Sequence, residues 1–483
     1  MSVSVTRADF VDALRSRNRA GINRNASRLL DMNAPLKSEW FSVANVLSAN
    51  GEVALSIAAA RRGAEESGGQ AEAQFQLANA LATVGHHDEA LAIASAIPSE
   101  QLAGVQRDHF IGTCALELGE FEAACEAFER VVSTIPVAGP AWLSLAALPA
   151  TDDAALLKRL DNVESAMATA RAPDRAQWHY ARGAVNDRLG NADRAFADFE
   201  AGAAITKVAR PYDRTADAVE AEAIATEFDD EAIARVALQV TTDSARPILV
   251  IGLPRSGTTL VEQILVSNNA VAGGTEAEFG AILAREIGGR TPAKLESFVS
   301  RKGADDLTRL YLHLGDERFG DGSRFVDKNV DNSRNLGVLA AVLPKAPIIW
   351  LRRDPLDCGW SCFRTFFNQG IEWSWSLSDI AAHFHAEDRL YEHWQHVLGD
   401  RMLTVRYEEL VADPGDWTGR ILEHARLDAE ATSRAHETRR PVLTASVAQV
   451  RQPIYQSSVG AADRYRAHLQ PFIEAYAATA SAD

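Results

Sequence analysis

The spacing of apolar and polar positions divides the chain into two parts. In the first part, apolar residues recur with the spacing of a helix face, and small residues recur with a period of 34, at Ala44, Ala78, Gly112 and Ala146. A glycine follows each of the first three after seven residues, as at Gly51. A small residue lets two helices approach closely, and glycine readily adopts the positive φ that ends a helix. The pattern therefore predicts stacked helix pairs.

This period is typical of tetratricopeptide (TPR) repeats, which we place over residues 37–207. One copy carries Asp153 where the glycine is expected, so we expect an irregular turn there. Stacked repeats leave a concave groove that often binds a protein or peptide partner, but the same array can serve as a spacer or a dimer surface. Residues 208–245 keep a helical pattern and are expected to link the array to the second part.

At residue 247 the pattern changes to a short β-branched run, PILVIG, followed by LPRSG and then by TTLVEQIL with helical spacing. A strand, a tight loop and a helix in this order form a phosphate cradle, because backbone N–H groups at the helix start point at the anion. Gly252 and Gly257 have the G-x-x-x-x-G spacing of a nucleotide-binding loop. Thr258 stands where a P-loop kinase or nucleoside triphosphatase has lysine, which disfavours those two classes.

Arg255 supplies the positive charge inside this loop instead. The segment GLPRSGTTLVEQIL resembles the 5′-phosphosulfate-binding loop of sulfotransferases that use 3′-phosphoadenosine-5′-phosphosulfate (PAPS). The resemblance implies that the loop and the helix start bind PAPS without a metal. The residues implied are Arg255, Ser256, Gly257, Thr258 and Thr259.

A second motif follows about a hundred residues later, in APIIWLRRDPLDCGWSCFRTFF. PIIWL is typical of a buried strand, and Asp354 and Pro355 are typical of the N-cap and first residue of a helix. Arg353 and Ser361 can then converge on one phosphate, the first by its charge and the second by its hydroxyl group. The pair resembles the 3′-phosphate motif of the same family. Arg352 points to the other face of the strand, and we expect an ordinary ion pair there.

Sulfuryl transfer moves negative charge onto the leaving phosphate and needs a base at the incoming hydroxyl group. Lys328, in the segment FVDKN, resembles the family lysine that reaches the bridging oxygen; the alternative is an ion pair with Asp327 or another acid. No histidine lies near the loop, so we consider carboxylates as the base. Glu276, directly after GGT, is preferred by resemblance, and Glu278 is the alternative. The implied catalytic residues are Glu276, Lys328 and Arg255.

Two further segments, DKNVDNSRNLGVLAAVLPKAPIIWLRRDPLD and VRYEELVADP, resemble protein-tyrosine sulfotransferases. In the second, Tyr407 matches a family aromatic residue near the adenine. The resemblance of the C-terminal segment implies that Ser446 and Arg451 face the cofactor or the acceptor. The histidines from His383 to His396 alternate with acids on a predicted helix, and we interpret them as a solvated face.

Composition narrows the choice of partners and compartment. The 483 residues include 49 Lys+Arg and 66 Asp+Glu, giving a net charge of −17 that repels nucleic acids and anionic lipid surfaces. We therefore expect neither nucleic-acid nor membrane binding. Four cysteines cannot form a disulfide framework and lack zinc-site spacing, and we expect Cys358 and Cys362 to be core residues. The N-terminus lacks the apolar run of a signal peptide, so we expect a cytoplasmic protein.

These observations predict an α + α/β protein: an N-terminal TPR α-solenoid followed by a P-loop-type α/β domain with a central parallel sheet. The expected segments are a helical segment at 1–36, the TPR array at 37–207, a helical linker at 208–245, the sulfotransferase domain at 246–476 and a tail at 477–483. The resemblance implies PAPS-dependent transfer to a hydroxyl group, with the acceptor left open among tyrosine, small molecules and glycans. The alternatives are a TPR adaptor whose second domain only binds nucleotide, and a P-loop kinase or triphosphatase. A homodimer is compatible with both halves.

Overall fold

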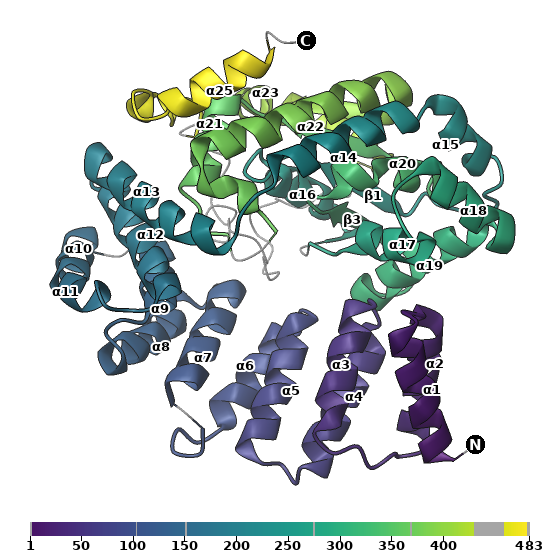
Figure 1. Cartoon of the computed structure of the whole chain (residues 1–483), viewed down its shortest axis with the longest axis horizontal. Coiled ribbons are helices and arrows are strands. Elements are labelled where there is room, and N and C mark those ends of the chain that lie inside the picture. Colours follow the sequence, from purple (N-terminus) through teal and green to yellow (C-terminus); the bar gives the residue numbers. More distant parts are fainter. Residues whose placement is uncertain are drawn as a thin grey trace.

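The chain folds into a helical array and an α/β domain that contact each other at two places (Figure 1). The structure is a computed structural model. It describes residues 2–102, 104–149, 152–273, 276–367, 370–428 and 458–480.

Successive helices of the array pack against each other as pairs, for example α3 with α4, α7 with α8 and α12 with α13. The pairing buries continuous apolar clusters between neighbouring helices. The helices are α1 (Val3–Arg15), α2 (Arg19–Asp31), α3 (Glu39–Ala49), α4 (Val53–Glu66), α5 (Ala71–Thr83), α6 (His87–Ala96), α7 (Gly104–Leu118), α8 (Phe121–Thr134), α9 (Gly139–Ala147), α10 (Asp153–Asn162), α11 (Glu164–Met167), α12 (Ala172–Arg188) and α13 (Ala192–Ala209).

Small residues sit where the helices approach most closely. Gly51 follows α3 with a φ of 80°, which L side chains rarely adopt. At Gly112, an added Cβ atom would lie 2.7 Å from the ring of Phe128, so a larger residue would push α7 away from α8. The copy with Asp153 lacks this geometry, because α9 ends at Ala147 and α10 begins only at Asp153. The arrangement is consistent with a solenoid, and the TPR assignment stays a prediction.

The α/β domain is built on a five-stranded sheet in the described part of the chain, with the order β2-β3-β1-β4-β5 and every pair parallel. The strands are β1 (Pro247–Ile251), β2 (Val271–Ala272), β3 (Arg324–Lys328), β4 (Ile348–Arg352) and β5 (Met402–Arg406). The helices of this part are α14 (Arg214–Glu227), α15 (Asp230–Ala237), α16 (Thr258–Val266), α17 (Phe279–Ile287), α18 (Pro292–Lys302), α19 (Ala304–Phe319), α20 (Asn332–Val342), α21 (Pro355–Phe363), α22 (Leu377–Leu398), α23 (Tyr407–Ala412), α24 (Pro414–His424) and α25 (Gln470–Ala480). Short 3-10 helices are η1 (Glu372–Trp375), η2 (Gly399–Arg401) and η5 (Asp463–Tyr465).

Both faces of the sheet are covered, which explains why every residue of β1 is buried. Ile248 and Val250 pack on the side of α16 and α24, whereas Leu249 and Ile251 pack into the larger cluster on the side of α20 and α22. The same alternation runs along β3 and β4. Residues next to each other on a strand therefore face different helices, and this sorts the charged residues at the strand ends.

The sheet order brings three loops together. β3 and β4 flank β1, with Val250 opposite both Lys328 and Ile349. Because all strands are parallel, the segments that follow β1, β3 and β4 leave the sheet at the same edge. The phosphate-loop motif, Lys328 and the Arg353 motif are thus neighbours at this edge.

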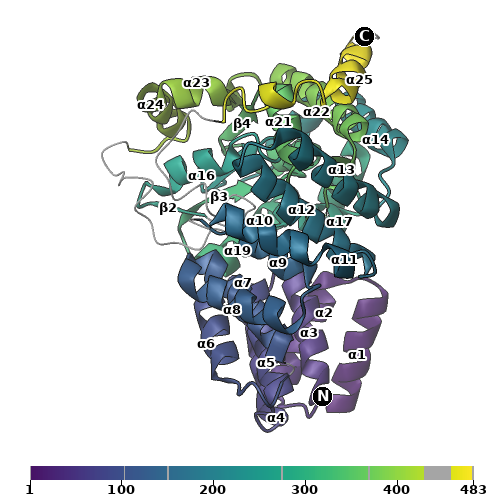
Figure 2. The same cartoon turned by 90° about the vertical axis from the view of Figure 1, so that its left-hand side faces the viewer.

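The array meets the α/β domain at two separate places along its length. Near its start, Arg318 of α19 donates to the Val84 carbonyl at 2.6 Å, and His313 lies 3.1 Å from Glu52. Near its end, Tyr180 of α12 donates to the Phe363 carbonyl of α21 at 3.0 Å. Figure 1 shows the resulting arc of helices, with α3 and α4 next to α19. Figure 2 shows α4–α8 below the sheet, α12 and α13 at about the level of the sheet, and α25 at the top.

Among the residues that the structure describes, none of the helices combines the length and the apolar character that crossing a bilayer requires.

Candidate active site

The loop after β1 has the shape that its glycines predict. Gly252 has a φ of 153° and Gly257 a φ of 108°, and Gly257 is the N-cap of α16. A Cβ atom on Gly257 would lie 2.6 Å from the Tyr407 ring, so only glycine fits there. Ser256 is buried, and both its N–H group and its hydroxyl donate to the Leu253 carbonyl. The loop therefore folds back on itself and presents the start of α16, at Thr258, to the edge of the sheet.

The loop and the helix α21 bring the two predicted motifs together. Arg255 Nε donates to Ser361 Oγ at 3.1 Å, and Arg353 donates to the Arg255 carbonyl at 2.9 Å. The Arg353 guanidinium lies over the Tyr407 ring, 4.7 Å from its centre. We call Arg255, Arg353, Ser361 and Tyr407 the arginine cluster. Two motifs about a hundred residues apart in sequence thus form one site.

The arginine cluster brings the two guanidinium groups of Arg255 and Arg353 together. The pKa of Arg255 is lowered, because the surrounding protein removes water from its guanidinium and because Arg364 and Arg353 lie nearby. The terminal nitrogens of Arg353 donate to the Arg255 and Ser458 carbonyls, and its Nε is buried without a hydrogen-bond partner among the described residues. A bound anion would satisfy this Nε group of Arg353.

The helix α21 is held in place by its predicted cap and by two cysteines. Asp354 is the N-cap, its side chain accepts from the Asp357 N–H group, and Pro355 opens the helix, as the sequence predicts. Cys358 and Cys362 are buried core residues, as expected, and each Sγ lies 3.3–3.4 Å from the Pro254 carbonyl. The loop thus rests on the helix that carries Ser361.

The predicted Arg352 contact is confirmed. Arg352 pairs with Asp388 and lies over the ring of Tyr391, on the face opposite Arg353. This is the alternation expected for successive residues at the end of a strand.

A second group of residues surrounds Lys328 at the end of β3. Lys328 Nζ lies 3.0 Å from Glu276, 3.4 Å from Glu262 and 3.4 Å from the Thr259 hydroxyl. We call these four residues the lysine cluster. The side chains of Lys328 and Glu262 are each 4% exposed, whereas that of Glu276 is 43% exposed. Burial lowers the pKa of Lys328, but the carboxylates of Glu262 and Glu276 outweigh it, so the pKa is raised overall.

Asp327 does not pair with Lys328, because it lies on the other face of β3. Its carboxylate accepts from Tyr311 at 2.5 Å and from Asn332 at 3.0 Å. Burial raises the pKa of Asp327 to about 6. The acids that contact Lys328 are instead the two glutamates of the lysine cluster.

The two candidate bases lie in different surroundings. Glu276 contacts Lys328, whereas Glu278 is the N-cap residue of α17 and lies 3.8 Å from Arg285. Only Glu276 of this pair therefore belongs to the lysine cluster. Ser446 and Arg451, which the sequence places at the cofactor or acceptor, lie outside the described residues.

The interpretation of His383 as part of a solvated face is wrong. His383 is 8% exposed, stacks on Trp373 with 4.3 Å between ring centres, and lies 2.8 Å from Asp217. Asp217 also pairs with Arg334 at 2.6 Å, and Arg334 pairs with Glu387. The helical spacing could not reveal this network, because Asp217 comes from the predicted linker, 166 residues away. Glu262 was also missed, although a lone acid within the apolar helix TTLVEQILV was a usable signal.

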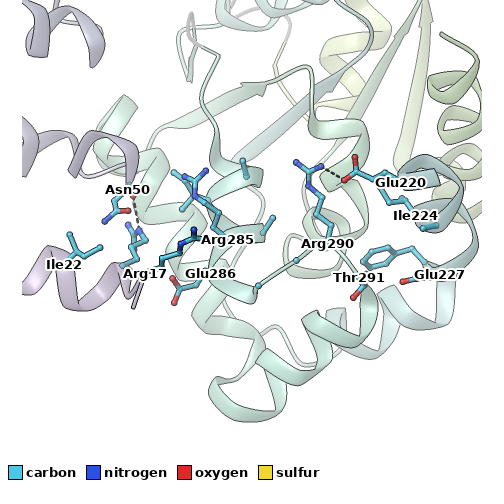
Figure 3. A pocket seen from close by; sticks show the side chains of 18 of the residues that line it. Arg17, Ile22, Asn50, Glu220, Ile224, Glu227, Arg285, Glu286, Arg290 and Thr291 are labelled. Carbon is cyan, nitrogen blue, oxygen red and sulfur yellow. Dashed lines mark hydrogen bonds and ion pairs between the residues drawn. The ribbon is translucent and has the colours of Figure 1, made fainter. Parts of the chain in front are cut away.

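A cavity of about 20 Å³ is lined by Ser256 and Arg353, and two larger cavities lie farther from the clusters. One of about 200 Å³ lies beside the loop and is lined by Pro254, Asp331 and Trp373, among others. The larger, of about 820 Å³, lies between α1–α3 and α14, α17 and α18, away from the predicted catalytic groups (Figure 3). Arg290 and Glu220 line both cavities and form an ion pair of 2.9 Å, drawn as a dashed line in Figure 3. This pair therefore borders both spaces.

Comparison with known proteins relates the second half to one family. Residues 247–431 match the sequence model of the sulfotransferase family. An uncharacterized protein of Aquifex aeolicus (strain VF5) is 30% identical over 244 residues, which are 48% of this chain but only 32% of that relative. The chain thus spans about a third of the curated relative it matches.

Solved sulfotransferases also resemble the chain. The sulfotransferase domain of the Synechococcus PCC 7002 olefin synthase has 17% identity and a TM-score of 0.30, and covers 47% of this chain and 97% of its own. Sulfotransferase STF1 from Mycobacterium tuberculosis H37Rv has 16% identity and a TM-score of 0.28, and covers 66% of this chain and 98% of its own. On the family match, the C-terminal region contains a sulfotransferase family domain.

Proposed function

We propose that this protein transfers the sulfuryl group of PAPS to a hydroxyl acceptor. The observation that carries the proposal is the arginine cluster, in which Arg255 contacts both Ser361 and Arg353 at the carboxyl edge of β1 and β4. The family match of residues 247–431 supports the same reaction. Both cofactor motifs are complete in this chain, which favours a working enzyme over an adaptor that only binds nucleotide.

The residues of the arginine cluster suit a donor with a negative group at each end. The start of α16, with Thr258 and Thr259, and Arg255 would hold the phosphosulfate. Arg353 and Ser361 would hold the 3′-phosphate, because the buried Arg353 Nε has no hydrogen-bond partner among the described residues and two arginines already crowd the site. Tyr407, stacked under Arg353, would flank the adenine.

The lysine cluster would carry out the proton and charge transfers. PAPS supplies an activated sulfuryl group. A bond forms between the acceptor oxygen and sulfur, the bond from sulfur to the phosphate oxygen breaks, and 3′,5′-bisphosphoadenosine leaves. Glu276 would take the acceptor proton, and the Lys328 ammonium, aided by Arg255, would hydrogen-bond the leaving oxygen. No resident metal is part of this scheme, because these cations supply the positive charge.

The proposal also includes a role for the helical array and a cellular location. We place the array in the role of recruiting the acceptor or a protein partner, since it joins the domain both at α19 and at α21. A cytoplasmic location is supported by the free cysteines Cys114, Cys358 and Cys362, all of them buried. A homodimer is part of the proposal, and light scattering of the full chain tests it.

The donor site is tested by calorimetric titration of 3′,5′-bisphosphoadenosine into the full chain. Arg353→Gln should weaken binding about a hundredfold, because a charged hydrogen-bond donor to phosphate is lost. Arg352→Gln is a matched control on the opposite face and should change the affinity less than about threefold. Equal effects of the two variants would contradict the assignment of Arg353.

Turnover is tested separately with sulfur-labelled PAPS and a panel of phenolic, peptide and carbohydrate acceptors. Release of bisphosphoadenosine together with a labelled acceptor is the expected result. Binding without transfer to any acceptor would instead favour the nucleotide-binding adaptor. Tight magnesium-dependent binding of ATP would favour a triphosphatase, despite Thr258 in the lysine position.

A further inference from the structure

The cavity of about 200 Å³ is lined by residues that adjoin both clusters in the sequence. Its wall includes Leu253 and Pro254, which directly precede Arg255, and Val330 and Asp331, which follow Lys328 by two and three residues. Asn329 donates to the Ala277 carbonyl at 3.3 Å, which ties this second segment to the residue after Glu276. A molecule in the cavity would therefore contact residues that adjoin members of both clusters in the chain.

The charged groups around this cavity are mostly carboxylates. They come from α14, from the segment before α18, from α20 and the residue before it, from η1 and from α22. The carboxylates are Asp217, Glu220, Asp331, Glu372 and Glu387, and the guanidinium groups are Arg290 and Arg334. Five carboxylates against two guanidinium groups leave an excess of three negative charges, or two when His383 is protonated.

The two arginines are already engaged by these acids. Arg334 is buried and pairs with Asp217 and Glu387, and lies 3.6 Å from Glu220. Arg290 pairs with Glu220, and both residues line this cavity as well as the larger one (Figure 3). The two arginines therefore cannot offer free positive charge to an anionic acceptor. The carboxylates in excess can attract a cation.

Glu372 is placed to select the charge of an incoming molecule. It is partly exposed on η1, beside the buried pair of Trp373 and His383. Its neighbour Trp373 adds an aromatic wall, which favours an organic cation over a small ion. The net charge of −17 acts in the same direction at longer range.

We infer that this cavity binds the acceptor and selects one that carries a positive charge, an ammonium or guanidinium group, near its reacting hydroxyl group. The inference rests on the proposed transferase function, but it concerns the acceptor alone. The titration of bisphosphoadenosine against Arg353→Gln reports on the donor site, so a failure of either proposal can be recognised separately.

Three para-substituted phenols of similar size test the charge preference. Tyramine is the cation, 4-propylphenol the neutral compound and 3-(4-hydroxyphenyl)propanoate the anion. Their binding to the full chain is measured by ligand-observed NMR titration, with and without saturating bisphosphoadenosine. Tyramine should bind at least about tenfold more tightly than the propanoate, because like charges in a partly dry cavity repel strongly. Equal binding, or tighter binding of the propanoate, would overturn the inference.

Two glutamine variants distinguish the effect of the cavity on acceptor binding from the effect of the overall charge of the chain. Glu372→Gln should reduce the ratio of tyramine to propanoate affinity at least about threefold, and Glu372→Lys should favour the propanoate. Glu227→Gln removes the same charge from the larger cavity and should leave the ratio within about twofold. If Glu372→Gln and Glu227→Gln weakened the preference equally, the preference would come from the overall charge of the chain. This result would overturn the assignment to this cavity.

Discussion

The arginine cluster and the lysine cluster lie at the same edge of the sheet but balance their charges in opposite ways. In the arginine cluster, Arg353 donates to backbone carbonyls and Arg255 has other arginines nearby. In the lysine cluster, Lys328 lies between Glu262 and Glu276. The first cluster brings two cations together, whereas in the second two carboxylates more than offset one ammonium group.

In the proposed reaction, this difference would let one edge of the sheet bind the donor with one cluster and act on the acceptor with the other. A site that binds a stable anion gains from unmatched cations, since the ligand itself supplies the countercharge. A site that must first keep and then release a proton needs a base held close to a cation. In the proposed reaction, the exposed Glu276 would reach the acceptor, whereas the buried Glu262 would only hold Lys328.

The largest expected effect comes from removing the exposed carboxylate of Glu276. Glu276→Gln should lower kcat about a thousandfold, because the base is lost, while the affinity for bisphosphoadenosine stays within about threefold. Glu278→Gln, whose carboxylate lies near Arg285, should retain nearly full activity in the same sulfur-labelled assay. If both variants lost activity equally, the division between these two glutamates would be wrong.

A milder change tests the arginine cluster. Ser361→Ala removes the hydroxyl that accepts from Arg255, and the dissociation constant for bisphosphoadenosine should rise about tenfold. Ser300→Ala, at an exposed serine on α18, is the control and should leave binding unchanged. Calorimetry measures both. An unchanged affinity in Ser361→Ala would show that Ser361 only supports the loop.

The smallest expected effect concerns the buried acid of the lysine cluster. The pKa of Lys328 is raised by Glu262 and Glu276, so the ammonium stays charged below that raised value and is lost as pH rises through it. Glu262→Gln should lower this pKa and move the alkaline limb of the rate profile to lower pH. At neutral pH the rate should change less than about threefold. A rate profile identical to that of the unaltered chain would mean that Glu262 does not tune Lys328.

Local patterns predicted the parts of the site that depend on one strand and the turn after it. The strands around PILVIG and PIIWL, the glycine-bounded loop and the Asp354 cap all lie where the sequence places them. Each of these features is set by residues within one helical turn or one strand of each other. The opposite faces of Arg352 and Arg353 follow from strand alternation alone.

Contacts between distant segments could not be predicted in this way. His383 is buried because Asp217 and Trp373 cover it, and Asp217 belongs to the segment interpreted as a linker. Whether Lys328 pairs with Asp327 or with Glu262 depends on which helix covers each face of β3. Such choices need the order of strands in the sheet, which the spacing of residues along one chain does not contain.

The two junctions of the array with the α/β domain have a mechanical consequence. A helical array that is attached at one end can change its curvature freely. This array contacts the α/β domain near Val84 and again near Tyr180. Any change in its curvature must therefore strain one of these two contacts. The second contact is made to Phe363, two residues beyond Ser361. A change in the curvature of the array would therefore be transmitted to the helix that carries this serine.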